Sequence, residues 1–287
     1  MTDALETLIE TASMRTIPPG VAAMADMVRA RHTGAVAVLA YGSALRGEKL
    51  ADTLIDFYVL TRDFAGVSAT GLSRLCCRLV PPNVYYAEAS IGGENLRSKY
   101  AVLPLALFQS RLTRQTTNPY FWARFAQTPA LVWTADAATR AKVVAALALA
   151  TRTMFANALS CGACDALAIW EAGFRATYRT ELRSEGPGRA RELVAANGEF
   201  YAAAAALLKD EPPVRANWPL RRIAGRLLSI LRLLKAAFTF QGGADYAAWK
   251  IARHSGVTIV VSDWQRRHPI LAGITLLPKL LRTGALR

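Results

Sequence analysis

The sequence predicts an α+β fold, with a mixed strand and helix part at residues 1–133 and a helical part at residues 134–287. Short apolar runs rich in Val, Ile, Leu and Phe, bounded by glycines and charged residues, recur between residues 35 and 104. Such runs are typical of buried strands. From about residue 136 the sequence becomes alanine-rich with helical periodicity. We therefore expect two domains that meet near residue 133.

The first part predicts two helices followed by a set of strands. Apolar residues at helical spacing predict a helix over 5–12, and a Pro18-Pro19-Gly20 break separates it from a second helix over 21–31. Strands are expected at about 35–41, 54–61 and 84–89, a short helix at 66–78, and a helix at 105–113. Residues 96–102 form a fourth strand or a loop at a site, and Val132 belongs to a strand that closes the domain.

The second part predicts four helices, at 138–159, 166–185, 189–209 and 220–240. Pro187-Gly188, Pro212-Pro213 and Gly242-Gly243 separate them, since proline and glycine end helical periodicity.

The charge of the chain predicts an anionic partner. The 287 residues carry a formal net charge of +14, and thirteen Lys/Arg against two Asp fall between residues 212 and 287. A protein this basic attracts nucleic acid, anionic lipid or nucleotide, and composition does not choose among them.

The N-terminal sequence predicts a cytoplasmic protein. Residues 1–6 are acidic and lack the apolar core of a secretory signal. No run approaches the roughly 18–20 apolar residues of a membrane-spanning helix. No obligate protein partner is evident.

Two basic amphipathic segments, 219–240 and 266–287, predict contact with a membrane surface or with nucleic acid. The first places Leu220, Ile223, Leu227, Leu231, Leu234 and Phe238 on one side, and we expect that side to pack onto the domain. The second segment is the stronger candidate for peripheral association with an anionic membrane.

The stretch from Tyr41 to Leu60 carries the chemistry. An apolar run leads into Gly42-Ser43, a basic connection follows, and a second apolar run contains Asp56. A carboxylate in a buried strand needs compensation, which Mg²⁺ would supply. Gly42 permits close approach of the backbone to a ligand, and the Ser43 hydroxyl can donate a hydrogen bond to a phosphate oxygen.

Gly-Ser, about a dozen residues, then Asp in an apolar strand resembles the pattern of polymerase-beta-like nucleotidyltransferases. The narrower resemblance is to the mitochondrial translocator-maintenance type of phosphatidate cytidylyltransferase (CDP-diacylglycerol synthase). Its Tyr-Gly-Ser, Val-Tyr-Tyr and Lys-Tyr-Gly-Val-Ile segments are similar to residues 41–43, 84–86 and 99–103. Residues 120–129 and 178–185 are fainter matches. The family's Trp/His-rich segment after the Asp strand is missing.

The resemblance implies a polymerase-beta-like nucleotidyltransferase core that transfers CMP from CTP to phosphatidic acid, with Mg²⁺ as cofactor. It implies that Tyr41, Gly42, Ser43 and Lys99 bind the nucleotide and that Asp56 binds the metal. Arg124 and Arg183 become weaker candidates for the lipid phosphate, because a guanidinium binds phosphate bidentately.

A second acid is normally needed in this chemistry, and the family of polymerase-beta-like enzymes has it two positions after the first. Tyr58 stands there. Asp52, Asp63, Glu88 and Glu181 are alternative sources. We favour Glu88 as the second catalytic carboxylate, on a strand expected to lie beside the Asp56 strand.

Two other functions remain open on the sequence. Tyr58 and the missing Trp/His segment favour a degenerate nucleotidyltransferase-like module that binds RNA or anionic lipid without catalysis. A nucleotidyltransferase with an RNA or small hydroxyl acceptor is the third reading.

Overall fold

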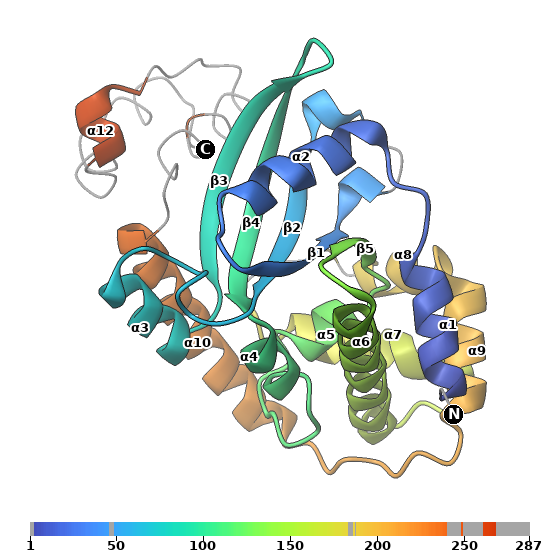
Figure 1. Cartoon of the computed structure of the whole chain (residues 1–287). Helices are drawn as coiled ribbons and strands as arrows, with labels where there is room; N and C mark the ends of the chain where they lie inside the picture. The colour runs from blue at the N-terminus through green and yellow to red at the C-terminus, as the bar shows by residue number, and fades with distance from the viewer. Residues whose placement is uncertain are drawn as a thin grey trace.

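The computed structural model describes residues 3–45, 49–182, 186, 188–239, 248 and 261–267. Within them the chain is mixed α/β, with one five-stranded mixed sheet and helices on both of its faces (Figure 1). This confirms the α+β class.

The strands are β1 (Ala35–Tyr41), β2 (Leu54–Thr61), β3 (Asn83–Ile91), β4 (Glu94–Pro104) and β5 (Ala130–Thr134). They lie in the order β3-β4-β2-β1-β5, with β2 parallel to β4 and the other neighbours antiparallel. Residues 94–104 therefore form a strand. Gly92 and Gly93, with φ of 60° and 81°, make the tight turn between β3 and β4, which residues with a Cβ adopt at a cost.

The helices of the first part are α1 (Ala4–Ser13), α2 (Pro19–Ala30), α3 (Gly71–Leu79), α4 (Leu105–Ser110) and α5 (Trp122–Phe125), with short 3₁₀ turns η1 (Ser43–Leu45) and η2 (Leu50–Asp52). The Asp3 carboxylate accepts a hydrogen bond from the amide of Leu5 and caps α1, and Pro19 starts α2. The helices expected from the sequence are thus present, with α3 and α4 shorter than predicted.

The helices of the second part are α6 (Ala137–Ala158), η3 (Leu159–Cys161), α7 (Ala166–Tyr178), α8 (Arg189–Ala195), α9 (Gly198–Leu207), α10 (Trp218–Thr239) and α12 (Asp263–Arg267). The single helix predicted at 189–209 is wrong: it is interrupted at Ala196 and Asn197. The Asn197 amide donates to the carbonyl of Leu193, and such side-chain bonds compete with helix continuation. The helix predicted at 166–185 ends at Tyr178.

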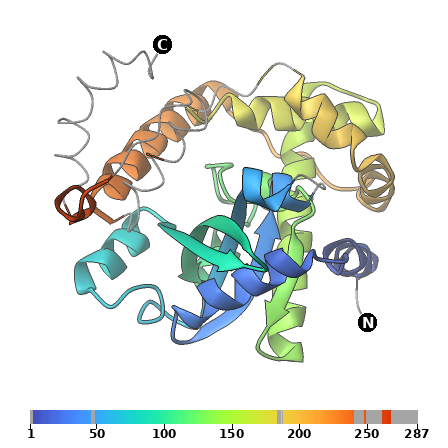
Figure 2. The same ribbon diagram turned by 90° about the horizontal axis from the view of Figure 1, so that it is seen from above.

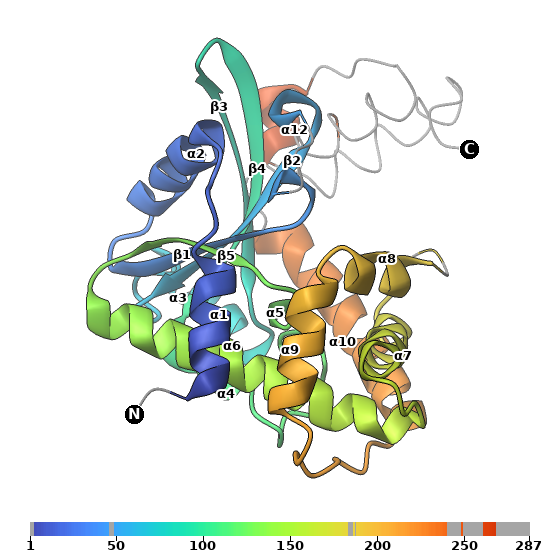
Figure 3. The same cartoon turned by 90° about the vertical axis from the view of Figure 1, so that its right-hand side faces the viewer.

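One buried cluster runs through both parts of the chain, from Leu5 on α1 to Leu208 after α9. Helix α6 packs against β1, β5 and α5, and α1 packs on α6 and α9 (Figure 3). The last strand ends at Thr134, next to the expected boundary. The division into two domains stays a prediction.

Helix α6 with η3, Ala137–Cys161, is long and apolar enough to cross a membrane, and 72% of its most apolar window is buried inside the protein. The expectation that no stretch reaches this composition is therefore wrong. Alanines raise the average hydropathy of this segment, while its packing is that of a central core helix.

Helix α10 is oriented against expectation. Its aliphatic residues point outward: Leu220 and Ile223 are 61% and 62% exposed, and Leu227, Ile230, Leu231, Leu233 and Leu234 are also exposed. Its inner side carries Arg221, Gly225, Arg232 and Lys235. At Gly225 a Cβ would lie 2.5 Å from the Thr180 carbonyl oxygen, so the helix approaches the end of α7 closely there. The prediction that the apolar side packs onto the domain is wrong for these residues.

Candidate functional site

The candidate site lies on one face of the sheet. Residues opposite one another in neighbouring strands point to the same face, and every second residue along a strand does so too. Asp56 is in register with Tyr41 on β1 and Lys99 on β4, and Lys99 is in register with Tyr86 on β3. Figure 2 shows α2 on one side of the sheet and α10 on the other. His32, at the end of α2, contacts Tyr85 and Tyr100 of the opposite face, so the Asp56 row faces the side of α10.

The turn after β1 brings Gly42 against Asp56. Gly42 has φ of 90°, and a Cβ there would lie 3.1 Å from the Oδ2 atom of Asp56. Because Gly42 has no side chain, the backbone at this turn approaches the carboxylate closely. The main chain turns into η1 at Ser43, whose side chain lies outside what the structure describes, as do residues 46–48 of the basic connection.

Lys99 and Asp56 are neighbours across the parallel pair β2 and β4, both half-buried. Adjacent strands are about 4.8 Å apart, so the ammonium and the carboxylate share one small region of the face. The sequence placed these two residues in one site from the resemblance alone, and the register brings them together.

Glu88 does not join them. Strand β4 lies between β3 and β2, so the expectation that Glu88 neighbours the Asp56 strand is wrong. Its carboxylate is held by Arg97 at 3.1 Å, by the Asn95 amide at 2.7 Å and by the Tyr86 hydroxyl at 3.1 Å. These contacts explain Glu88 as a structural residue at the edge of the sheet.

The other candidate acids have positions or contacts of their own. Asp63 accepts hydrogen bonds from the amides of Ala65 and Gly66 at the far end of β2, and Asp52 is exposed on η2. Glu181 lies 3.9 Å from Arg124. Among the residues that the structure describes, no three His, Cys, Asp or Glu side chains gather as a metal site.

Tyr58, two residues after Asp56, is fully buried on the same face. Its ring meets Phe125 edge-on at 4.8 Å between centroids, and its hydroxyl accepts from the Nη1 atom of Arg124 at 3.4 Å. Burial raises the pKa of Tyr58 well above its ordinary value. A neutral phenol at this position supports the neighbouring guanidinium and does not replace a carboxylate as a metal ligand.

Arg124 on α5 is the centre of a second polar group on this face. Its Nη1 atom donates to the hydroxyl of Tyr120 at 3.3 Å, and its Cζ atom lies 5.5 Å from the ring centroid of Tyr41. Burial alone would lower the pKa of Arg124, but the phenol oxygens of Tyr120, Tyr58 and Tyr41 raise it above its usual value. The resemblance made Arg124 a candidate for the lipid phosphate, and that role stays a prediction; Arg183 lies outside the described residues.

Tyr120 and Arg232 are residues of the candidate site that the sequence did not predict. The Cζ atom of Arg232, on α10, lies over the ring of Tyr120, 3.7 Å from its centroid. The two residues are 112 positions apart in the sequence. Its Nε atom donates to the carbonyl of Pro81 at 3.2 Å. The sequence predicted that this basic segment contacts a membrane surface or nucleic acid, and only packing shows that Arg221 and Arg232 turn inward.

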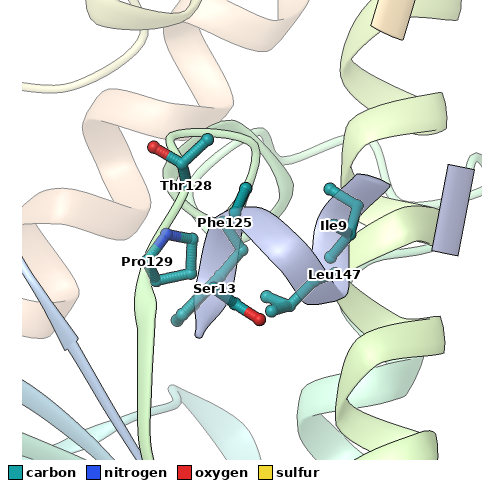
Figure 4. A pocket seen from close by; sticks show the side chains of 7 residues that line it. Ile9, Ser13, Phe125, Thr128, Pro129 and Leu147 are labelled. Carbon is teal, nitrogen blue, oxygen red and sulfur yellow. The ribbon is translucent and has the colours of Figure 1, made fainter. Parts of the chain in front are cut away.

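A separate cavity lies between α1, α6 and the segment before β5 (Figure 4). Its volume of about 10 Å³ has room for no more than about one water molecule. Ile9, Phe125, Pro129 and Leu147 are among its lining residues, and the Ser13 hydroxyl donates to the Glu10 carbonyl. It is a packing defect and not a substrate site.

No protein-family model matches the chain, and no curated protein matches it.

Proposed function

We propose that the chain is a nucleotidyltransferase that transfers CMP from CTP to phosphatidic acid, giving CDP-diacylglycerol and pyrophosphate at a membrane surface. The observation that carries the proposal is the close approach of Gly42 to Asp56, with Lys99 in register beside the carboxylate. A glycine turn, the carboxylate of Asp56 and the ammonium group of Lys99 on a single sheet face suit a triphosphate and its counter-ion.

Asp56 is the residue that would hold Mg²⁺. Its Oδ2 atom lies beside a turn residue that has no side chain, and Mg²⁺ is often bound by only one or two protein carboxylates together with substrate phosphates and water. The chemistry that Mg²⁺ supplies when bound is charge stabilisation on the attacked phosphate and on the departing pyrophosphate.

The protein's own groups position the two substrates. Lys99 would contact the triphosphate, and the backbone amides at Gly42-Ser43 would donate to its oxygens, with the Ser43 hydroxyl in the role expected from the sequence. An oxygen of the lipid phosphate attacks the α-phosphorus of CTP, the new P–O bond forms, and the bond to the β-phosphate breaks with its electron pair leaving on pyrophosphate. A phosphate monoester is already ionised near neutral pH, so the acceptor needs no strong general base. This makes a single acid in the β2 strand sufficient.

The outward aliphatic face of α10 supports a membrane-surface acceptor. Seven exposed Leu and Ile side chains on one helix of a chain with net charge +14 suit adsorption to an anionic bilayer, where apolar insertion and basic attraction act together. The proposed localisation is accordingly cytoplasmic with peripheral membrane association. Residues 268–287 of the second basic segment lie outside the described residues.

The test is to mix the full-length protein with CTP labelled at the α-phosphate, vesicles containing phosphatidic acid, and Mg²⁺, and then to extract the lipid. Label in the organic phase supports the proposal. Asp56→Asn is the matched variant: it keeps the size of a half-buried side chain and removes its charge, so we expect a folded protein without turnover. If Asp56→Asn transfers CMP at the wild-type rate at saturating Mg²⁺, the assigned centre is wrong.

A binding module without catalysis is the second candidate, and the buried Tyr58 at the usual place of a second acid favours it. Its signature is absence of label in the lipid phase together with tight, salt-sensitive binding of RNA or of anionic vesicles. A labelled water-soluble product from an RNA or small hydroxyl acceptor would favour the third reading, a nucleotidyltransferase with another substrate.

A further inference from the structure

Helix α10 turns its cationic side chains toward the protein. Arg221 is buried and its Nη1 atom donates to the Oδ1 atom of Asn157 on α6 at 2.6 Å. Lys235 donates to the carbonyl of Val80 at 2.6 Å, to that of Pro82, and to the Oδ1 atom of Asn83 at 3.1 Å. These hydrogen bonds to neutral acceptors hold Arg221 against α6 and Lys235 against the start of β3.

Arg232 differs from these two because the ring that it lies over, that of Tyr120, also contacts a second guanidinium, that of Arg124. Two guanidinium groups therefore lie close to one phenol ring, with Cζ atoms 3.7 and 4.6 Å from its centroid. Within the described part of the chain, the one carboxylate that forms an ion pair with either of them is Glu181, at a distance of 3.9 Å. Positive charge in a largely buried place is costly unless an anion compensates it, and here cations exceed acids.

The excess of positive charge changes the pKa of the Tyr120 hydroxyl. Burial would raise the pKa of Tyr120, but the charges of Arg124 and Arg232 outweigh it and lower the pKa below its ordinary value. Burial also lowers the pKa of Arg232. The region thus favours a negative charge, and burial disfavours the cation of Arg232.

We propose that Arg124 and Arg232 together bind the phosphate monoester of the acceptor, so that α10 forms the acceptor side of the site. This rests on the proposed function. Two guanidinium groups with Cζ atoms 3.7 and 4.6 Å from the centroid of one phenol ring suit a dianionic phosphate, which accepts several parallel hydrogen bonds.

The two faces of α10 then define the acceptor as an amphiphile. The inner face presents Arg232 to the polar face of the sheet, and the outer face presents Leu227, Leu231 and their neighbours. A lipid would use both faces, since its phosphate reaches the inner face while its acyl chains stay in the bilayer beside the outer face. A free phosphomonoester would use only the inner face.

The experiment compares two arginines of the same helix in the full-length protein. Arg232→Gln removes the inner guanidinium, Arg232→Lys keeps the charge without the fork, and Arg226→Gln is the control because Arg226 is exposed. Titration calorimetry measures binding of water-soluble dihexanoyl phosphatidic acid, of dihexanoyl phosphatidylcholine, of inorganic phosphate and of CTP.

We expect Arg232→Gln to weaken binding of dihexanoyl phosphatidic acid roughly 10- to 150-fold, as for loss of one hydrogen bond to a charged group, with CTP affinity unchanged. Arg232→Lys should fall between wild type and Arg232→Gln, and Arg226→Gln should match wild type. Phosphatidylcholine, which lacks the monoester, should not bind at this site. Inorganic phosphate binding as tightly as the lipid, with the same dependence on Arg232, would overturn the amphiphile and leave a free phosphomonoester.

Unchanged lipid affinity in a folded Arg232→Gln protein, or equal losses for lipid and CTP, would overturn the assignment. If Arg232→Gln does not fold, as judged by circular dichroism, Arg232→Lys decides: it must lower lipid affinity while keeping CTP affinity. The two proposals fail separately. If lipid binding depends on Arg232 but no CMP is transferred, the transferase is excluded and the phosphate site stands. If CMP is transferred and the KM for the lipid is unaltered in Arg232→Gln, the transferase stands and the phosphate site is excluded.

Discussion

At the scale of single residues, the contact of Gly42 with Asp56 is the feature most sensitive to change. Gly42→Ala adds a Cβ at 3.1 Å from Oδ2 and forces a residue with a side chain to φ of 90°. We expect a loss of about 1–2 kcal/mol in the free energy of unfolding from the left-handed backbone, and a much larger loss of CMP transfer from the blocked space. Urea unfolding and the transfer assay measure the two.

Gly34→Ala is the matched control, since Gly34 has φ of 80° and no atom within 4 Å of the added Cβ. It should share the stability loss and keep its activity. Equal activity losses in the two variants would mean that Gly42 acts only through the backbone.

His32 gives the fold a pH dependence. Its ring is buried, its Nδ1 atom is 3.0 Å from the Gly66 carbonyl oxygen, and burial lowers the pKa of His32 below 6.5. Between that lowered value and 6.5 the unfolded chain binds a proton that the folded chain does not, so stability is fully present above about pH 6.5 and is lost as the pH falls below it. Denaturant unfolding across pH 5–8 should show this slope.

His32→Gln should flatten the slope, because the titrating group is gone. The double variant His254→Gln/His268→Gln should keep it, which separates His32 from the other histidines. A slope that is identical in wild type and His32→Gln would assign the pH dependence to other groups.

At the scale of elements, α10 is the helix whose side chains are distributed against the usual rule. Its aliphatic side chains are exposed and its inner side is fastened by Arg221, Arg232 and Lys235. Exposed aliphatic patches of this kind mark an interaction surface.

Replacing Leu227 and Leu231 by serine should reduce co-sedimentation with vesicles that contain phosphatidic acid. It should leave the melting temperature nearly unchanged, because neither side chain is buried in the fold. Leu207→Ser is the control, since Leu207 is also exposed but lies on α9. A large drop in melting temperature would instead show that the outer face of α10 is covered by another part of the protein.

At the scale of the whole molecule, the net charge of +14 predicts how vesicle binding responds to salt. Surface attraction is screened over about 10 Å at 0.1 M ionic strength and about 3 Å at 1 M. Binding to vesicles with phosphatidic acid should therefore weaken steeply between 0.05 and 0.5 M NaCl, down to the level of neutral phosphatidylcholine vesicles. Salt-independent binding would assign the adsorption to apolar insertion alone.

The sequence predicted much of the fold because apolar periodicity is local. The runs at 35–41 and 54–61 have the bounds of β1 and β2, and the alanine-rich stretch from 138 forms α6. It failed where a few side chains decide: Asn197 interrupts a helical pattern that continues on both sides of it. Periodicity also finds a helix without showing which of its sides is buried, and so α10 was oriented the wrong way.

By itself the sequence determined the α+β class, most of the helices and strands and the basic balance, and it proposed the Gly42, Asp56 and Lys99 set of the candidate site. Tertiary structure alone decided that β4 separates Glu88 from Asp56, and that Arg232 faces Tyr120 across 112 positions of chain. The physical reason is that strand order and helix orientation follow from non-local packing. The separation of Glu88 from Asp56 and the contact of the Arg232 guanidinium with Tyr120 arise only after distant segments of the chain have packed together.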